Sequence, residues 1–198
     1  MDTTVPLTLE PVVPTCPVKR FTSDQYVEMI HAGILTEDDR VELIDGVITP
    51  MPPAGEEHNW GTVTLNELFA EAWATHYVFV QGTTRISEID TFDPDLALVR
   101  RGESDQKKRH PQAADIDLVV EVAKSSLKQD QTKKALAYAK AGIAEYWIAD
   151  INSLSMIVHK QPTADGYQDI QSFGLDAELT PLAFPNITIR VGDVLGGG

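Results

Sequence analysis

The chain has 198 residues, of which 42% are hydrophobic and 23% are charged, and its formal net charge is −14. This size and composition are typical of one globular domain with a sizeable core, and no apolar run reaches the roughly 18 residues that a membrane-spanning helix needs. Taken alone, the acidity argues against nucleic acid as a partner, because neutralisation of phosphates drives that binding.

The charge is unevenly distributed along the sequence. Between residues 100 and 140 there are ten Lys and Arg against six Asp and Glu, whereas the rest of the chain holds six basic and twenty-four acidic residues. A locally basic segment can face a polyanion. Such a segment is more commonly the solvated face of a helix, so the charge pattern alone leaves both explanations open.

The start of the chain differs in composition from the remainder. Residues 1–20 contain several prolines and are predicted to form an extended N-terminal arm, followed by a single folded domain over residues 21–195. The arm lacks the basic start and apolar core of a secretory signal. Cys16 is the only cysteine, so no internal disulfide can form, which fits a reducing, cytoplasmic setting.

The first folded segments are predicted to be a helix and a β-hairpin. Residues 21–33 have the length and pattern of a short helix, with Ser23 as its N-terminal cap. The stretch VELIDGVI at 41–48 predicts two short strands, because Asp45-Gly46 between them is a strong two-residue turn signal. Both elements come before the segments that carry the candidate chemistry.

The rest of the chain alternates between helical and strand patterns. Apolar residues recur at helical spacing over 56–76, and Ser126 with Gln129 resembles a capping box for a second long helix that ends before Gly142. Strands are predicted at 77–82, 83–90, 92–102, 117–123, 145–150, 155–160, 167–173 and 187–191, with a polar loop at 103–115. This order predicts an α/β fold with a central sheet flanked by helices.

One predicted core strand, DLVVEVA at 117–123, contains a carboxylate. Glu121 lies between Val120 and Val122, where an unpaired ionised group is costly to bury. A buried ion pair is one explanation, but such pairs often stabilise a protein no better than an apolar residue would. Perturbed buried acids cluster at functional sites, so Glu121 is a candidate site residue.

Asp95 is the natural partner for Glu121. It follows Pro94 and opens the apolar run LALV, so it stands at the start of a predicted strand; alone, the Asp-Pro-Asp sequence would simply be a turn. If the two strands pair, both acids can face the same side of the sheet. Converging carboxylates form an oxygen site that suits Mg²⁺ or Mn²⁺ and does not suit Zn²⁺.

Strand alternation also bears on which lysine could complete such a site. Lys124 faces away from Glu121 unless a bulge intervenes. On the following helix Asp130, Lys134 and Tyr138 share one face, at positions i, i+4 and i+8. Periodicity alone favours a surface ion pair beside a packed tyrosine for these three residues.

Together these segments resemble the Uma-type (Uma2-like) family of restriction endonucleases in the PD-(D/E)XK nuclease superfamily. The resemblance covers roughly residues 20–195 and rests on VELIDGVI, on His58 before a long helix, and on the later motifs. Those motifs are Pro94-Asp95, Glu121-Val122, Ser125-Ser126, Asp130, Lys134, Tyr138, Gly142, Glu145-Tyr146-Trp147 and Asp150.

The resemblance implies a restriction-endonuclease-like core with additional β-hairpins and assigns roles to individual residues. It implies metal ligands at Asp95 and Glu121, with Glu42 as a further ligand, although an outward-facing strand position is equally expected for Glu42. The chain has Ala123 where the superfamily usually has its lysine, and Lys134 is expected to replace it. Further auxiliary candidates are His58, Asp130 and Tyr138, and for His58 a capping or surface role is at least as common.

The function implied is a Mg²⁺- or Mn²⁺-dependent endonuclease that hydrolyses phosphodiester bonds in nucleic acid, most simply DNA, by a metal-activated water. Binding of the strand backbone is expected from Arg100, Arg101, Lys107, Lys108 and Arg109. A cytoplasmic homodimer would bring two basic segments together against the overall acidity. Two alternatives stay open: a catalytically degenerate nuclease fold that acts as a binding protein, and a metal-dependent enzyme acting on a small phosphorylated molecule.

Overall fold

The computed structural model describes residues 18–102 and 109–196. Most of the predicted N-terminal arm, including Cys16, lies outside the described residues, as do the two predicted backbone-binding residues Lys107 and Lys108. The division of the chain into an arm and one domain therefore stays a prediction.

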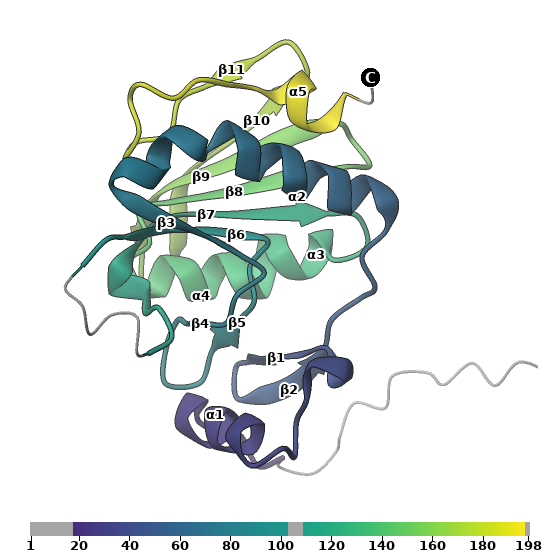
Figure 1. The fold of residues 1–198 in the computed structure, drawn as a ribbon, viewed down its shortest axis with the longest axis vertical. Coiled ribbons are helices and arrows are strands. Elements are labelled where there is room, and N and C mark those ends of the chain that lie inside the picture. Colours follow the sequence, from purple (N-terminus) through teal and green to yellow (C-terminus); the bar gives the residue numbers. More distant parts are fainter. Residues whose placement is uncertain (1–17, 103–108, 197–198) are drawn as a thin grey trace, which may run out of the picture.

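A six-stranded mixed sheet forms the centre of the fold (Figure 1), with the strand order β10-β9-β8-β7-β6-β3. Only β7 and β8 run parallel, and every other neighbouring pair is antiparallel. β7 and β8 are buried almost throughout, which explains their near-continuous apolar sequences. The strands are β3 (His76–Val80), β6 (Leu96–Arg100), β7 (Ile116–Ala123), β8 (Glu145–Asp150), β9 (Ser155–Thr163) and β10 (Gly166–Gly174).

Helices cover both faces of this sheet (Figure 1). On one face, Phe69 at the end of α2 packs with Val120, and the C-terminal helix α5 belongs to the same core cluster. On the other face, Tyr138 of α4 packs with Val119. The helical elements beside the sheet are α2 (Glu56–Leu68), α3 (Leu127–Gln129), the π-helical turn η5 (Asp130–Lys134), α4 (Ala135–Lys140) and α5 (Val191–Leu195).

A second sheet of four strands lies beside the face that α4 covers, with the order β2-β1-β5-β4. Asp45 and Gly46 join its first two strands with positive φ angles of 51° and 71°, which is the two-residue turn that the sequence predicts. Its strands are β1 (Val41–Ile44), β2 (Val47–Pro50), β4 (Thr84–Arg85) and β5 (Thr91–Phe92). The remaining elements are α1 (Ser23–His31), β11 (Glu178–Leu179), β12 (Ile189–Arg190) and the 3₁₀ turns η1 (Glu37–Asp39), η2 (Ala70–Ala74) and η4 (Ala113–Asp115).

The predicted element boundaries need several corrections. Thr22, rather than Ser23, caps α1, because Ser23 is buried and its hydroxyl donates to the carbonyl of Ser87 instead. The helix predicted over 56–76 ends at Leu68 and continues as a 3₁₀ turn. Ser126 has helical backbone angles and caps no backbone amide. The predicted last strand is reduced to two residues before α5 begins.

The predicted fold class is confirmed: the chain has a mixed α/β architecture with a central sheet between helices. Among residues 18–102 and 109–196, no helix is long and apolar enough to cross a membrane.

Candidate active site

Asp95 immediately precedes β6, and Glu121 stands opposite it near the end of β7. β6 and β7 are antiparallel with Leu96 opposite Val120, so Asp95 and Glu121 each stand one residue beyond this pair. Their alternate-position neighbours pack in the core cluster under α4. The backbone amide of Asp95 donates to Glu121 Oε2 at 3.3 Å, and the amide of Val122 donates to Asp95 Oδ2 at 2.8 Å.

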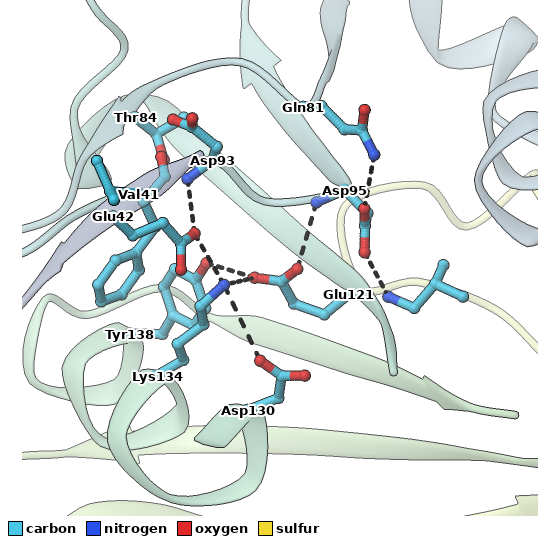
Figure 2. A network of polar contacts seen from close by, with 12 residues as sticks. Val41, Glu42, Gln81, Thr84, Asp93, Asp95, Glu121, Asp130, Lys134 and Tyr138 are labelled. Atoms are coloured by element: carbon cyan, nitrogen blue, oxygen red, sulfur yellow. Dashed lines mark hydrogen bonds and ion pairs between the residues drawn. The ribbon is translucent and has the colours of Figure 1, made fainter. Parts of the chain in front are cut away.

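Lys134 reaches Glu121 from the helix side (Figure 2). Its Nζ lies 2.9 Å from Glu121 Oε1 and 2.9 Å from Glu42 Oε1. Asp130 Oδ1 is 3.9 Å from the same nitrogen. The structure therefore brings together side chains from β1, β7 and η5 that are widely separated in sequence, and all four are buried.

The helix that carries Asp130 and Lys134 is locally widened. Residues Asp130–Lys134 form a π-helical turn between the α-helical segments α3 and α4. Turns of this kind are rare and occur frequently at functional sites. Here the turn begins and ends at the two buried charged residues of the cluster, so the distortion coincides with the part of the helix that faces Glu121.

Tyr138 fixes the orientation of Glu121. Its hydroxyl donates to Glu121 Oε1 at 3.1 Å, and its ring packs edge-on against Phe92 with centroids 5.4 Å apart. Lys134 donates to the same oxygen, while the amide of Asp95 bonds the other. Both oxygens of Glu121 therefore have donors from three different segments.

His58 approaches Asp95 from the other side of the sheet. It lies in the first turn of α2, and its Nε2 is 3.0 Å from Asp95 Oδ2, whereas its buried Nδ1 has no hydrogen-bond partner among the described residues. The hydrogen bond to Asp95 raises the pKa of His58 against the opposing effect of burial. Gly61 lets α2 come this close, since a Cβ there would lie 3.2 Å from Val122 Cγ1.

The cluster holds more acids than cations. Glu42, Asp95, Glu121 and Asp130 are all buried, and Lys134 is the buried lysine among them. Burial raises the pKa of Glu121 well above its usual value; Lys134 opposes this effect and the other three acids add to it. Burial likewise raises the pKa of Asp130. For Lys134, burial lowers the pKa, but the charges of Glu121, Glu42 and Asp130 outweigh it and raise the pKa above its usual value.

The residues fit a hard divalent cation by donor chemistry. Among residues 18–102 and 109–196, no group of three or more His, Cys, Asp and Glu is arranged to hold a metal ion. The donors of the cluster are nevertheless carboxylate oxygens, which Mg²⁺ and Mn²⁺ prefer. Asp130 Oδ1 is buried and has no hydrogen-bond partner in the described part of the chain. An excess of buried negative charge with an unpaired oxygen is the environment that an added cation relieves.

Two residues of the site were missed by the sequence reasoning. Asp93 donates its backbone amide to Glu42 Oε1 at 2.9 Å, and burial raises the pKa of its carboxyl group to about 6. Gln81 donates from Nε2 to Asp95 Oδ1 at 3.2 Å. Asp93 could have been found as the first acid of Asp-Pro-Asp. Gln81 carries no signal beyond its place in a turn before Gly82.

The predicted backbone-binding arginines lie away from this cluster. Arg100 ends β6 and Asp95 precedes it, so about 16 Å of strand separates them at 3.2–3.4 Å per residue. Arg100 pairs with Asp117, and Arg109 pairs with Asp115. The guanidinium of Arg101 lies 4.2 Å from the ring centroid of Tyr77. Lys124 is likewise not part of the cluster, being exposed and paired with Glu57, as strand alternation predicts.

Comparison with known proteins gives a consistent result. The model of the Uma2 family, described as "Putative restriction endonuclease", matches residues 23–192. A crystal structure described as a putative nuclease belonging to DUF820 from Anabaena variabilis ATCC 29413 superimposes with a TM-score of 0.67. It is 17% identical in sequence, and the match covers 89% of this chain and 98% of that one. No curated protein matches the sequence significantly.

Proposed function

The chain belongs to the Uma2 family of restriction-endonuclease-like proteins, and from that premise we propose that it is a metal-dependent endonuclease that hydrolyses phosphodiester bonds in DNA. The family supports a nuclease and therefore a hydrolase. The finer statement is supported by one observation: the buried side chains of Glu121 and Lys134 are in contact, and the backbone amide of Asp95, just before β6, bonds the same glutamate.

Asp95 and Glu121 would hold Mg²⁺ or Mn²⁺ through their carboxylates. When bound there, such an ion would supply Lewis-acid polarisation of the phosphate and would make the attacking water easier to deprotonate. The pairwise contacts of Asp95 with the amide of Val122 and with His58 hold its carboxylate in a fixed orientation. A ligand set held this way is preorganised, so little of the binding free energy is spent on ordering it.

Lys134 is the residue that acts on the phosphate directly. Because the neighbouring acids raise its pKa above the usual value, the side chain stays protonated throughout the neutral range. A buried ammonium in a site of low dielectric stabilises the negative charge that develops on a phosphate oxygen in the transition state. The superfamily usually has its lysine at the position of Ala123, and Lys134 on the helix would take over its role.

Glu42 and Tyr138 act by positioning the groups that touch the substrate. Glu42 Oε1 accepts from both Lys134 and the amide of Asp93. This supports an anchoring role for Glu42 in addition to the ligand role that the family resemblance implies. Tyr138 holds Glu121 Oε1 from the helix. Loss of either residue is expected to loosen the cluster without removing a reacting group.

The test is cleavage of supercoiled plasmid and of short single strands in Mg²⁺, in Mn²⁺ or in EDTA. Cleavage is expected in the metal-containing reactions and is expected to disappear in EDTA, in Asp95→Ala and in Lys134→Ala. A matched control is Lys140→Ala, which removes an exposed lysine from the far end of the same helix. Cleavage that survives EDTA or either active-site substitution would contradict the mechanism.

A second candidate function is favoured by the net charge of −14. An enzyme acting on a small phosphorylated molecule needs the same metal and lysine but no large basic surface. If the substrate is DNA, a homodimer that brings two basic segments together would offset the repulsion between the acidic chain and the phosphates. Release of phosphate from mononucleotides without cleavage of any polynucleotide would favour the small-molecule function.

A further inference from the structure

A cavity of about 500 Å³ lies between the connection that follows β2 and the start of the helix that carries Lys134. Its size falls within the range of about 300–1,000 Å³ that is usual for small-molecule sites. In Figure 1, the end of β7, the start of α3 and the connection from β2 to α2 gather at the same side of the molecule. The lining residues are Pro50, Met51, Pro52, Ser125, Ser126, Lys128, Gln129, Thr132 and Lys133.

The helix wall of the cavity adjoins the acidic cluster. Lys133 immediately precedes Lys134, and Gln129 immediately precedes Asp130. Ser126 connects the two directly, because it lines the cavity and its carbonyl accepts from the backbone amide of Asp130 at 3.1 Å. This wall is therefore formed by residues adjacent in sequence to Asp130 and Lys134, which themselves lie buried behind it.

The opposite wall, formed by residues 50–52, is also close to the acidic cluster. The amide of Met51 donates to the carbonyl of Arg40 at 2.8 Å, so Arg40 lies directly behind this wall. Pro50 of this wall stands opposite Val41 in the β1–β2 ladder, and Val41 immediately precedes Glu42 of the cluster. The cavity is thus flanked on both sides by residues that neighbour the site.

The two walls differ in chemistry. The helix wall offers hydroxyl, amide and ammonium groups, whereas Pro50, Met51 and Pro52 form an apolar surface, and no lining residue is acidic in a chain of net charge −14. Within the described residues, no carboxylate pairs with Lys128 or Lys133, whereas Lys124, Lys134 and Lys160 all have acidic partners. Unpaired ammonium groups opposite an apolar wall suit a ligand with a phosphate on one side and a flat, weakly polar group on the other.

We propose that this cavity binds the nucleotide next to the scissile phosphate, and that the substrate strand is unpaired there. The phosphate contacts Lys128 and Lys133, and the base or sugar lies against Met51 and the prolines. A base inside a duplex cannot enter a pocket of this kind without leaving the stack, so a single strand is favoured. The proposal rests on the proposed nuclease function and specifies its substrate class.

Binding by the full-length protein in EDTA tests the proposal without cleavage. The probe is a fluorescently labelled single strand of about 12 nucleotides, within the span of known single-strand sites, and the same sequence as a duplex. The wild type is expected to bind the single strand more tightly. The double variant Lys128→Gln/Lys133→Gln is expected to bind it at least about tenfold more weakly, with a smaller dependence on salt.

Matched controls separate the cavity from general charge. Lys140→Gln removes an exposed lysine from the far end of the same helix and is expected to leave affinity within about twofold. Met51→Glu is expected to weaken binding, whereas Leu182→Glu, a change of the same charge at an exposed position, is expected to leave it unchanged. Thermal unfolding of each variant confirms that it is folded.

Three results would overturn the cavity proposal: no binding of the single strand by the wild type, equal affinity for the duplex, or unchanged affinity in the double lysine variant. If that variant still cleaves in a metal-dependent way with an unchanged KM, the cavity proposal is overturned, whereas the nuclease function is supported. Conversely, the wild type could bind the single strand, lose this binding in the double lysine variant, and cleave no nucleic acid. That result would overturn the nuclease function and support the cavity proposal.

Discussion

Two buried glutamates on neighbouring strands of the same sheet have opposite surroundings. Glu145 on β8 is fully buried, and donors satisfy both its oxygens: Trp147 Nε1 at 2.9 Å and the amide of Leu182 at 2.6 Å. Lys160 Nζ lies 3.3 Å from it and balances its charge. This is a satisfied structural carboxylate, of the kind that a folded core tolerates at little cost.

Glu121 on β7 is buried to a similar extent but is not balanced in this way. It shares Lys134 with Glu42, and the charges of Asp130, Asp95 and Glu42 all raise its pKa beyond the effect of burial. The difference shows that burial of an acid is not by itself a mark of function. An excess of buried acids over buried cations is the more informative sign.

The largest effect is expected from Lys134→Ala, because Glu42, Glu121 and Asp130 lose the cation that they share. The free energy of unfolding at neutral pH is expected to fall by about 3–5 kcal/mol, the usual consequence of stranding buried charges. Urea unfolding measures it, and Lys133→Ala is the control, expected to change stability by no more than about 0.5 kcal/mol. Equal stabilities of these two variants would show that Lys134 does not balance the cluster.

Glu145→Ala is expected to destabilise the protein by about 2–4 kcal/mol, because it leaves the buried indole N–H of Trp147 and the partly buried amide of Leu182 without acceptors. The loss is expected to be similar across the neutral pH range. The same urea unfolding experiment measures it. A variant as stable as the wild type would remove the structural role assigned to Glu145.

Glu121→Gln is expected to act in the opposite direction. The pKa of Glu121 is raised in the folded state, so its contribution to stability is greatest below its unfolded pKa and is lost as the pH rises through the folded pKa. Glutamine at this position avoids that loss, and Lys134 keeps Glu42 as a partner. The variant is therefore expected to be more stable than the wild type at pH 8, by on the order of 1 kcal/mol, with a difference that shrinks towards pH 4.

Asp93→Asn is expected to change how the stability depends on pH. Burial raises the pKa of Asp93 from 3.8 to about 6, so its contribution to stability is present below about pH 4 and is lost as the pH rises through about 6. The wild-type stability curve is expected to decline between these values by up to about 2 kcal/mol. The asparagine variant is expected to show a flatter curve, and an identical pH dependence in both proteins would refute the assignment.

Local signals in the sequence were enough to predict much of the fold. The Asp45-Gly46 turn predicted the hairpin. Alternation along β7 predicted that Lys124 faces away from Glu121, and in the structure Lys124 is exposed and pairs with Glu57. The helix predicted over 56–76 was too long, because apolar residues continue at helical spacing to Trp73. In the structure Trp73 lies in the 3₁₀ turn, and its side chain is 53% exposed. Periodicity cannot distinguish a buried apolar residue from an exposed one at the same spacing.

The site was predictable where residues share an element and not where they meet only in three dimensions. The common face of Asp130, Lys134 and Tyr138 follows from helical spacing, which alone favoured a surface ion pair. That face is instead buried, because β1 and β5 bring Glu42 and Phe92 over it. The contacts of Gln81 and Asp93 with the cluster likewise depend on tertiary packing, which no local pattern encodes.

The most direct test of the account compares metal-dependent cleavage by Glu121→Gln and Glu145→Gln, each at a temperature where the variant is fully folded. Glu121→Gln is expected to lose at least about a hundredfold in kcat, the scale for removing one preorganised electrostatic group. Glu145→Gln is expected to retain wild-type kcat in spite of its lower stability. Equal activity of the two variants, or loss of cleavage only in Glu145→Gln, would contradict the assignment of Glu121 to the active site.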